Sequence, residues 1–414
     1  MYYLIVGLLI SAIFGSPRLA FSQHEHHQPE PAAATHGLTL GGWNVMQDGV
    51  IFLTFDRQGG PRGETEFNTI NWWMAMFSRD LGAGRFTVST MLSLDPLTVG
   101  EDGYSEIFQA GETYDGKPLI DRQHPHDLLM QLAAVWRVPL NDSLGLTLAG
   151  GPVAEPALGP VAFMHRQSAA ENPTAPLGHH TFDSTHIAMG VITAALDSGP
   201  WMVESSIFHG REPDENRWDL MDPGALDSWS VRGWYRPQPE WTFQASHGFL
   251  NEPEALEPGD VRRTTLSAEW VRQGDTGYTA ALLGYGRNDK GQQAYNAVLA
   301  EATHKVGRTS FYGRFETLQV ETELLQTGVP HQHEDEPAAR DAVIAFTLGA
   351  VRDVWSWNGA DLGLGADVTF YGVPDALAPT HGSRPLSFHI FGRIRPPASL
   401  GRMWGQFMTK PMQH

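Results

Sequence analysis

Cysteine is absent from this 414-residue chain, so no disulfide framework holds its fold together. Long apolar runs are also missing: after the N-terminus none approaches the roughly 20 residues of a membrane-spanning helix, which excludes a helical membrane protein. Clusters of Lys and Arg are missing as well, and the formal net charge of -19 argues against binding of nucleic acid. This acidic balance is compatible with cations instead.

The chain does have a regular pattern of segment and link lengths. From about Trp43 to about Arg393, segments of roughly ten alternating residues are joined in turn by a very short link and a long polar one. This pattern is typical of a transmembrane antiparallel β-barrel with short periplasmic turns and long extracellular loops. We count about sixteen candidate strands, an even number with both ends on the short-turn side. The predicted fold class is therefore all-β, with one barrel over residues 41–396.

Alternation gives each strand one face toward lipid and one toward the lumen. In one segment, Leu362, Leu364 and Val368 fall on one face, and Asp361 and Asp367 fall on the other. A lumen that carries such charged side chains would hold water. The predicted lumen-lining residues are Arg232, Glu269, Arg314, Glu316, Asp361, Asp367, His389 and Arg393.

Tryptophans mark many candidate strand ends, as in the aromatic girdles at the two membrane interfaces. A soluble β-sandwich would also place aromatic residues near strand ends, but a sandwich of this length would usually form two domains. The membrane barrel is therefore the favoured interpretation. The tryptophans concerned are Trp43, Trp136, Trp201, Trp229, Trp241, Trp270, Trp355 and Trp357.

The two ends of the chain lie outside the predicted barrel. Residues 1–22 have the pattern of a secretory signal peptide, with an apolar stretch from Leu4 to Phe14; an N-terminal anchor helix is the alternative. Residues 23–40 are predicted to be a flexible, His-rich segment. Residues 397–414 are predicted to be a C-terminal tail, whose methionines would favour Cu(I) if the tail bound a metal.

Over nearly all of the mature chain, these features resemble bacterial outer-membrane β-barrel proteins of the porin and channel type, although no diagnostic family motif is present. The resemblance implies assembly in a Gram-negative outer membrane, contact with its lipid, and passive passage of small solutes. A homo-oligomer follows only by analogy with trimeric porins. One departure concerns the C-terminus: such barrels commonly end on an aromatic residue, whereas this chain continues past its last clear strand to His414.

Histidine is the most unusual part of the composition, with 18 residues, many of them in predicted loops. His124 and His126 flank a proline where a long loop enters a strand, and a carboxylate of Asp121 or Asp127 would fix their tautomers. The loop at about 152–183 is suited to folding inward and narrowing the pore. The histidines of this loop, together with His186 just after it, would then converge with His124 and His126 into one site. The alternative is that all these histidines hydrogen-bond the loops onto the barrel rim.

A third group, at residues 331–336, combines histidine with acidic side chains and resembles a flexible cation-binding tract. Imidazole and carboxylate ligands suit Zn, Cu or Ni, of which copper and zinc are expected first. The predicted metal ligands are His124, His126, Asp127, His165, His179, His180, His186, His331 and His333.

The sequence therefore favours a porin-like outer-membrane channel whose His-rich loops take part in the binding or passage of copper or zinc ions. One alternative is a barrel that binds metal without transporting it and so gives resistance. An outer-membrane hydrolase is a weaker alternative: Ser168, His165 and Asn172 supply the residue types of a catalytic triad, but no nucleophile motif accompanies them. No enzyme activity is expected.

Overall fold

The computed structural model of the chain describes residues 38–395, except for positions 221, 223, 258, 331–337, 358 and 359. The predicted signal peptide, the predicted tail at 397–414 and nearly all of the predicted N-terminal segment lie outside the described residues. The same holds for two predicted metal ligands, His331 and His333. What the structure describes is the predicted barrel with most of its loops.

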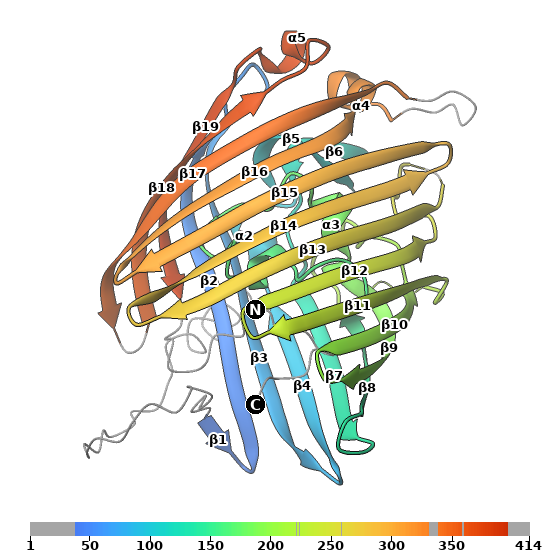
Figure 1. Ribbon diagram of the computed structural model, residues 1–414. Coiled ribbons are helices and arrows are strands. Elements are labelled where there is room, and N and C mark those ends of the chain that lie inside the picture. The colour runs from blue at the N-terminus through green and yellow to red at the C-terminus, as the bar shows by residue number, and fades with distance from the viewer. Residues whose placement is uncertain are drawn as a thin grey trace.

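Sixteen strands of the described residues form one closed antiparallel sheet, which confirms the predicted fold class (Figure 1). The last strand pairs with the first, with Phe388 opposite Arg57 and Ile394 opposite Ile51, and this pairing closes the barrel. The strands are β2 (Trp43–Arg57), β3 (Thr65–Leu81), β4 (Gly84–Leu92), β7 (Leu129–Pro139), β8 (Gly145–Ala154), β9 (Ala188–Ser198), β10 (Trp201–His209), β11 (Ser228–Gln238), β12 (Trp241–Leu250), β13 (Val261–Gly274), β14 (Gly277–Lys290), β15 (Gln293–Val306), β16 (Thr309–Glu321), β17 (Arg340–Trp357), β18 (Ala360–Gly372) and β19 (Leu386–Arg395).

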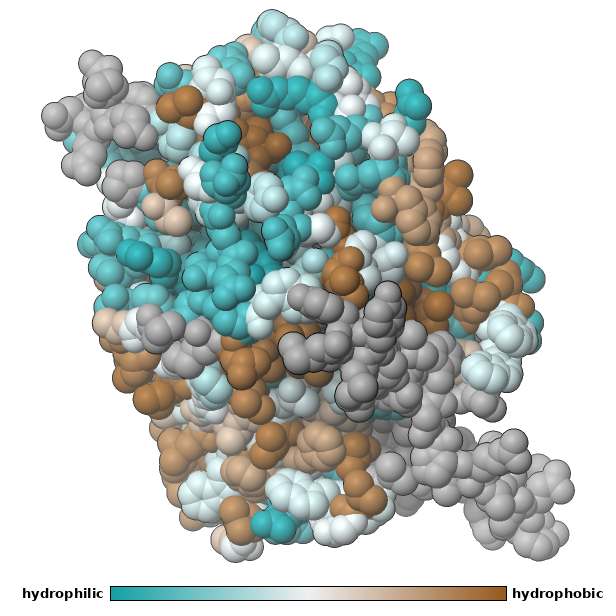
Figure 2. All heavy atoms as spheres, turned by 180° about the vertical axis from the view of Figure 1, so that it is seen from behind, coloured by the Kyte–Doolittle hydropathy of each residue, from teal (hydrophilic) through white to brown (hydrophobic). Residues whose placement is uncertain are grey.

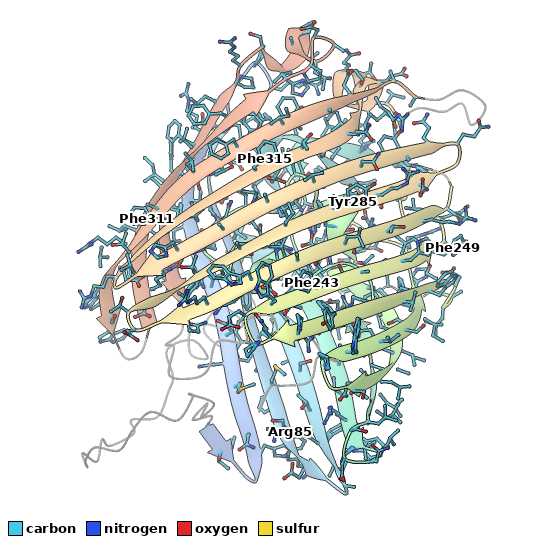
Figure 3. The ribbon with its side chains drawn as sticks, viewed as in Figure 1. Arg85, Phe243, Phe249, Tyr285, Phe311 and Phe315 are labelled. Atoms are coloured by element: carbon cyan, nitrogen blue, oxygen red, sulfur yellow. The ribbon has the colours of Figure 1, made fainter. Side chains whose placement is uncertain are left out.

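Alternating side chains give the barrel an apolar outer face and a polar inner face. In β16, Phe311 and Phe315 are exposed on the outside (Figure 3), whereas Tyr312, Arg314 and Glu316 are buried on the inside. In β10 and β12 the burial switches at nearly every residue in the same way. The period-two pattern of the sequence thus corresponds to real inner and outer faces.

The two ends of the barrel differ in their connections. At one end the links are short, as at Gly199 and Gly307, whose positive φ angles of 53° and 55° suit two-residue hairpin turns. At the other end, longer segments contain short helices. No helix among the described residues is long and apolar enough to cross a bilayer. The helices are α2 (Asp95–Thr98), η1 (Phe163–His165), α3 (His179–Phe182), η2 (Ser184–His186), α4 (Thr322–Thr327) and α5 (Ala378–His381).

The long segment between β4 and β7, which the sequence predicts to be a loop, contains a hairpin of its own. Its strands β5 (Tyr104–Tyr114) and β6 (Lys117–Gln123) pair with each other and not with the barrel sheet. Phe108 and Glu112 adopt positive φ angles of 70° and 59°, and the ladder is interrupted around them. These interruptions explain why the segment shows no clean alternation. A further short strand, β1 (Leu38–Leu40), pairs with the start of β2.

The segment at 155–187, between β8 and β9, lies inside the barrel, and we call it the interior loop. Nearly all of its residues are buried. On one side Arg166 forms an ion pair of 2.6 Å with Glu301 of β15. On the other side Met164 packs in the same cluster as Trp72 of β3. The interior loop therefore crosses the lumen and narrows it, as the sequence predicts for the loop at about 152–183.

Apolar residues cover the outer face toward the short-turn end of the barrel. Figure 2 shows hydrophobic residues over the lower part of one face and hydrophilic residues over the upper part, where the loops lie. Exposed tryptophans lie near the short-turn ends of β10, β12 and β17, where Trp355 and Trp201 are 59% and 57% exposed. Amphipathic rings in this position are typical of a membrane interface.

Candidate metal site at the loop end of the barrel

Five histidine rings come together where the interior loop meets the segment before β7. The rings of His179 and His186 have centres 5.3 Å apart, and those of His179 and His180 are 5.4 Å apart. The His124 ring lies 5.5 Å from that of His180, and the His126 ring lies 6.0 Å from that of His186. Two imidazoles bound to one tetrahedral ion have ring centres about 5 Å apart. Neighbouring rings of these five residues, the histidine cluster, thus lie at nearly the spacing of two imidazoles on one ion, although no three of these histidines bring their ligand atoms within 4.8 Å of one another in the described residues.

A hydrogen-bond acceptor contacts the Nδ1 atom of most of these rings. Nδ1 of His126 lies 2.7 Å from a carboxylate oxygen of Asp95, and Nδ1 of His179 lies 2.7 Å from Asp183. Nδ1 of His186 lies 2.8 Å from the backbone oxygen of Asp183. Because an acceptor faces Nδ1, the proton of the neutral ring belongs there and the lone pair is on Nε2. The same arrangement orients the histidine ligands of metal sites.

The opposite nitrogens of three rings have no hydrogen-bond partner. Nε2 of His124, His180 and His186 is buried and accepts no hydrogen bond from the residues that the structure describes. Nε2 of His124 lies 3.2 Å from Glu112, but not in an orientation that forms a hydrogen bond. Buried polar atoms without partners are rare and mark places where a water or an ion belongs. A cavity of about 10 Å³, enough for about one water, adjoins His124, His126 and His186.

His180 also belongs to a compact set of three ligands. One ligand atom from each of His180, Glu212 and Glu254 lies within 4.8 Å of the other two. Nδ1 of His180 is 2.9 Å from a carboxylate oxygen of Glu212. Glu212 follows β10 and Glu254 follows β12, so two loops bring the carboxyls to α3. We call these three residues the His180 group.

The charges of the His180 group depend on one another. Burial lowers the pKa of His180, but the Glu212 carboxylate outweighs burial and raises it to about 9. Burial would raise the pKa of Glu212, but His180 lowers it to about 2. Burial and then Glu212 raise the pKa of Glu254 well above its ordinary value. These shifts favour protons on His180 and Glu254, which are the protons that a cation would replace.

The β5–β6 hairpin and the barrel wall hold His180 in place. Arg263 of β13 and Asn288 of β14 donate to the backbone oxygen of His180 at 2.6 and 2.9 Å. Gly111 of β5 lies directly against the imidazole, and a Cβ atom there would overlap the ring. Gly111 has a φ of 147°, so a side chain is disfavoured on two grounds.

Two of the predicted residues take other roles. Asp121 does not fix a tautomer of His124 or His126, because it pairs with Arg62 at 3.1 Å and with His381 at 3.0 Å. Asp127 does not do so either: Arg217, which also pairs with Glu112, binds it at 3.2 Å. Asp95, in α2, is the carboxylate that holds His126.

His165 also lies apart from the other predicted histidines. Its ring packs edge-on against Trp72, with centres 4.9 Å apart, and not against the histidine cluster. Ser168 donates to Glu301 at 2.8 Å, and Asn172 accepts from the backbone of Thr174 at 3.1 Å. Within the described residues, Ser168, His165 and Asn172 therefore do not form a hydrogen-bonded triad.

Of the eight predicted lumen-lining side chains, Asp361 is half-buried and the other seven are buried. The buried ones are Arg232, Glu269, Arg314, Glu316, Asp367, His389 and Arg393. Several of them hold the interior loop. Arg232 donates to the backbone oxygen of Gly159 at 3.0 Å, and Arg393 pairs with Glu171. The buried charged side chains among the described residues comprise fourteen carboxyls and seven guanidiniums.

Comparisons with known proteins identify the fold. No protein-family model and no curated protein sequence matches the chain. OprB of Pseudomonas putida is 10% identical, with a TM-score of 0.52 over 86% of this chain and 94% of that one. A loop L8 deletion mutant of OmpT, an outer membrane protein of Vibrio cholerae, is 9% identical, with a TM-score of 0.51 over 86% and 99%. The chain thus has the fold of bacterial outer-membrane β-barrel proteins.

Proposed function

We propose that this protein is a porin-like channel of the bacterial outer membrane that binds transition-metal cations at the loop end of its pore. The His180 group would bind the cation, and the rest of the histidine cluster would surround it. Zinc and copper(II) suit the ligands, because imidazole nitrogen and carboxylate oxygen are the donors that both accept. The outer-membrane location is supported by the barrel fold, the apolar outer face and the tryptophans at the strand ends.

One observation carries the proposal more than any other: three buried imidazoles have an Nε2 atom without a hydrogen-bond partner among the described residues. A rim hydrogen-bonding role does not account for a buried second nitrogen that has no hydrogen-bond partner. Here an acceptor lies within 3.2 Å of Nδ1 in His124, His180 and His186, and Nε2 is left for something else. A cation that accepts the Nε2 lone pair of His124 or His186, or that replaces the proton of His180, removes the cost of burying these nitrogens unpaired.

Passage of cations is supported by the charge of the interior. Buried carboxyls outnumber buried guanidiniums by fourteen to seven within the described residues, and the excess charge is smaller than this count because burial raises the pKa of Glu106 and Glu112 to about 8. Such an excess attracts cations and repels anions in a narrow, low-dielectric pore. Binding at the mouth must stay weak enough for the ion to leave, since a tightly held ion would block the pore.

A barrel that binds metal without transporting it is the second candidate. The observation that favours it is the interior loop, which touches both walls of the barrel through Arg166 and Met164. If this loop leaves no continuous path, metal would be held at the mouth and not conducted. Conductance separates the two candidates, because both require binding and only the first requires ion flow.

The test uses the full-length protein in detergent. We expect Zn²⁺ titrated by calorimetry to bind saturably to a background protein in which His24, His26, His27, His36, His331 and His333 are replaced by Ala. We expect this binding to be lost when His180→Ala is added. The matched control is His304→Ala, because His304 lies near the short-turn end of β15 and is exposed. Equal binding by the background protein with and without His180→Ala would reject the site. Planar bilayers then decide about transport: a reversal potential that favours cations supports the channel, and absence of conductance supports the second candidate.

A further inference from the structure

Methionines gather on the inner face of one side of the barrel. The chain has 13 methionines, and seven of them belong to a single interior cluster of 21 residues. They come from β2, β3, β4, β7 and β9 and from the interior loop. We call them the methionine cluster: Met46, Met74, Met76, Met91, Met130, Met164 and Met189.

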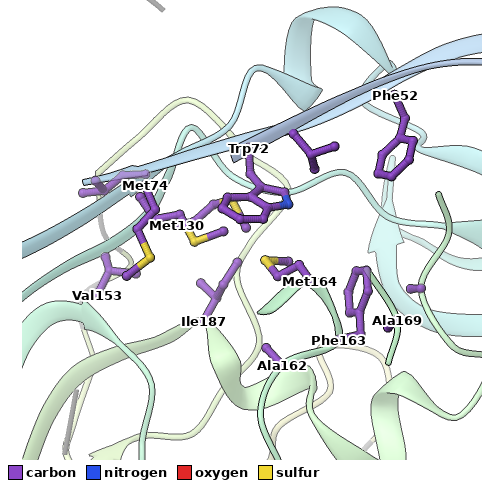
Figure 4. Packing of buried hydrophobic residues seen from close by; sticks show 14 of the residues in the cluster. Phe52, Trp72, Met74, Met130, Val153, Ala162, Phe163, Met164, Ala169 and Ile187 are labelled. Atoms are coloured by element: carbon purple, nitrogen blue, oxygen red, sulfur yellow. The ribbon is translucent and has the colours of Figure 1, made fainter. Parts of the chain in front are cut away.

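The register of the strands places these side chains opposite one another. Met46 is the partner of Met76 across β2 and β3, and Met74 is the partner of Met91 across β3 and β4. Directly opposed residues have Cβ atoms about 4.5–5.5 Å apart on one face of the sheet. Met164 reaches the same cluster from the interior loop. Several thioethers therefore come together inside the barrel, where Figure 4 shows some of them around the Trp72 ring.

His165 lies beside this cluster. It is half-buried, although the interior loop around it is buried almost everywhere. Its ring contacts Trp72, and neither ring nitrogen has a hydrogen bond or an ion pair with the part of the chain that the structure describes. Its neighbour Met164 belongs to the methionine cluster. An imidazole without a polar partner, next to several thioethers, lacks the partner that an interior polar group normally has.

We propose that the methionine cluster and His165 form a second metal site, for a soft monovalent cation such as Cu(I) or Ag(I). Thioether sulfur is a soft donor and selects such ions over Zn²⁺. Both ligand types are neutral, and the cost of burying an ion with neutral ligands rises with its charge, which favours a monovalent ion.

The site lies deeper in the barrel than the histidine cluster. Met130 follows His126 by four residues along the chain into β7, and Met189 follows His186 by three residues into β9. Three or four residues of chain span at most about 10–14 Å, so the two sites are near neighbours. This site goes beyond the proposed function, and neither site requires the other.

Silver nitrate is the probe, because Ag⁺ resembles Cu(I) and does not change oxidation state in air. The background for every variant replaces Met403, Met408 and Met412 by Leu, which removes the thioethers of the C-terminal tail. We expect the full-length background protein to bind Ag⁺ saturably in chloride-free buffer. We expect this binding to be lost when Met74→Leu, Met91→Leu and Met164→Leu are combined, because leucine keeps the volume and removes the sulfur.

Two controls make the result specific. Met202→Leu changes a buried methionine in a different cluster, with Trp234, and should leave Ag⁺ binding unchanged. His180→Ala should remove Zn²⁺ binding and leave Ag⁺ binding in place, so failure of one site is distinguishable from failure of the other. Heat-modifiable migration in gels checks that each variant is folded. Equal Ag⁺ binding by the background protein and the folded triple variant, or no saturable Ag⁺ binding by the background protein, would overturn the proposal.

Discussion

Replacing Arg166 by Met tests what holds the interior loop across the lumen. The Arg166 side chain is fully buried, and its guanidinium contacts Asp183 and Glu301 at 2.6 Å each and the backbone oxygen of Val161 at 2.7 Å. Methionine has a similar length and no charge, so the variant leaves two buried carboxylates without their cation. Removing one partner of a buried ion pair costs about 3–5 kcal/mol.

This cost falls on the docking of the loop more than on the barrel. Asp183 and Val161 belong to the interior loop, and the backbone pairing of the barrel strands does not involve Arg166. A loss of about 3–5 kcal/mol shifts the equilibrium between docked and undocked loop by about 10² to 10³ or more. We therefore expect the variant to keep its barrel and to conduct more in planar bilayers than the wild type.

Single-channel conductance and urea unfolding in detergent measure the two effects. Arg211→Met is the control, because Arg211 and its partner Glu252 are exposed and 3.3 Å apart, a kind of pair that contributes about 0–1 kcal/mol. Adding Glu301→Gln to Arg166→Met removes one of the unpaired charges and should recover part of the loss. If Arg166→Met matched Arg211→Met in both conductance and unfolding, the ion pairs would not be what holds the loop.

Three further predictions concern the metal site. Zn²⁺ affinity should rise as the pH is raised from about 6 to about 9, because His180, with a pKa of about 9, must lose its proton to bind; calorimetry showing a flat profile would contradict this. Gly111→Ala should weaken Zn²⁺ binding by displacing the His180 ring, while gel migration shows an intact barrel. Asp183→Asn should raise conductance, because Asp183 pairs with Arg166, and should weaken Zn²⁺ binding less than His180→Ala does, because Asp183 orients His179, which adjoins the His180 group but does not belong to it; unchanged conductance would refute it.

The barrel could be predicted from the sequence because its signal is repeated and local. Each strand alternates, as Phe311 and Phe315 do against Arg314 and Glu316, and a slip of one residue would turn every side chain to the wrong face. The β5–β6 hairpin could not be predicted in the same way. Its ladder is interrupted around Phe108 and Glu112, so periodicity is lost where the backbone is irregular.

The candidate site was predictable only in part, for a different physical reason. Histidines close together in the sequence, such as His179 and His180, indicate the region of a site. They do not show which side chains from other segments will contact them. Glu212 and Glu254 are carried by two other loops, and the only sequence signal for them is that all long loops lie at one end of a barrel. His165 was expected in the same site, but its place on η1 turns it toward Trp72.

On the proposed function, Asp183 is the residue that would connect metal binding with the position of the interior loop. Its carboxylate accepts from His179 at 2.7 Å and from Arg166 at 2.6 Å, and its backbone oxygen lies 2.8 Å from Nδ1 of His186. On the proposed function, a cation that draws His179 or His186 toward itself also moves the residue that anchors Arg166. Since Arg166 ties the interior loop to Glu301, occupancy of the metal site biases the position of the loop. Linkage makes this effect reciprocal, so any change that undocks the loop must also change metal affinity.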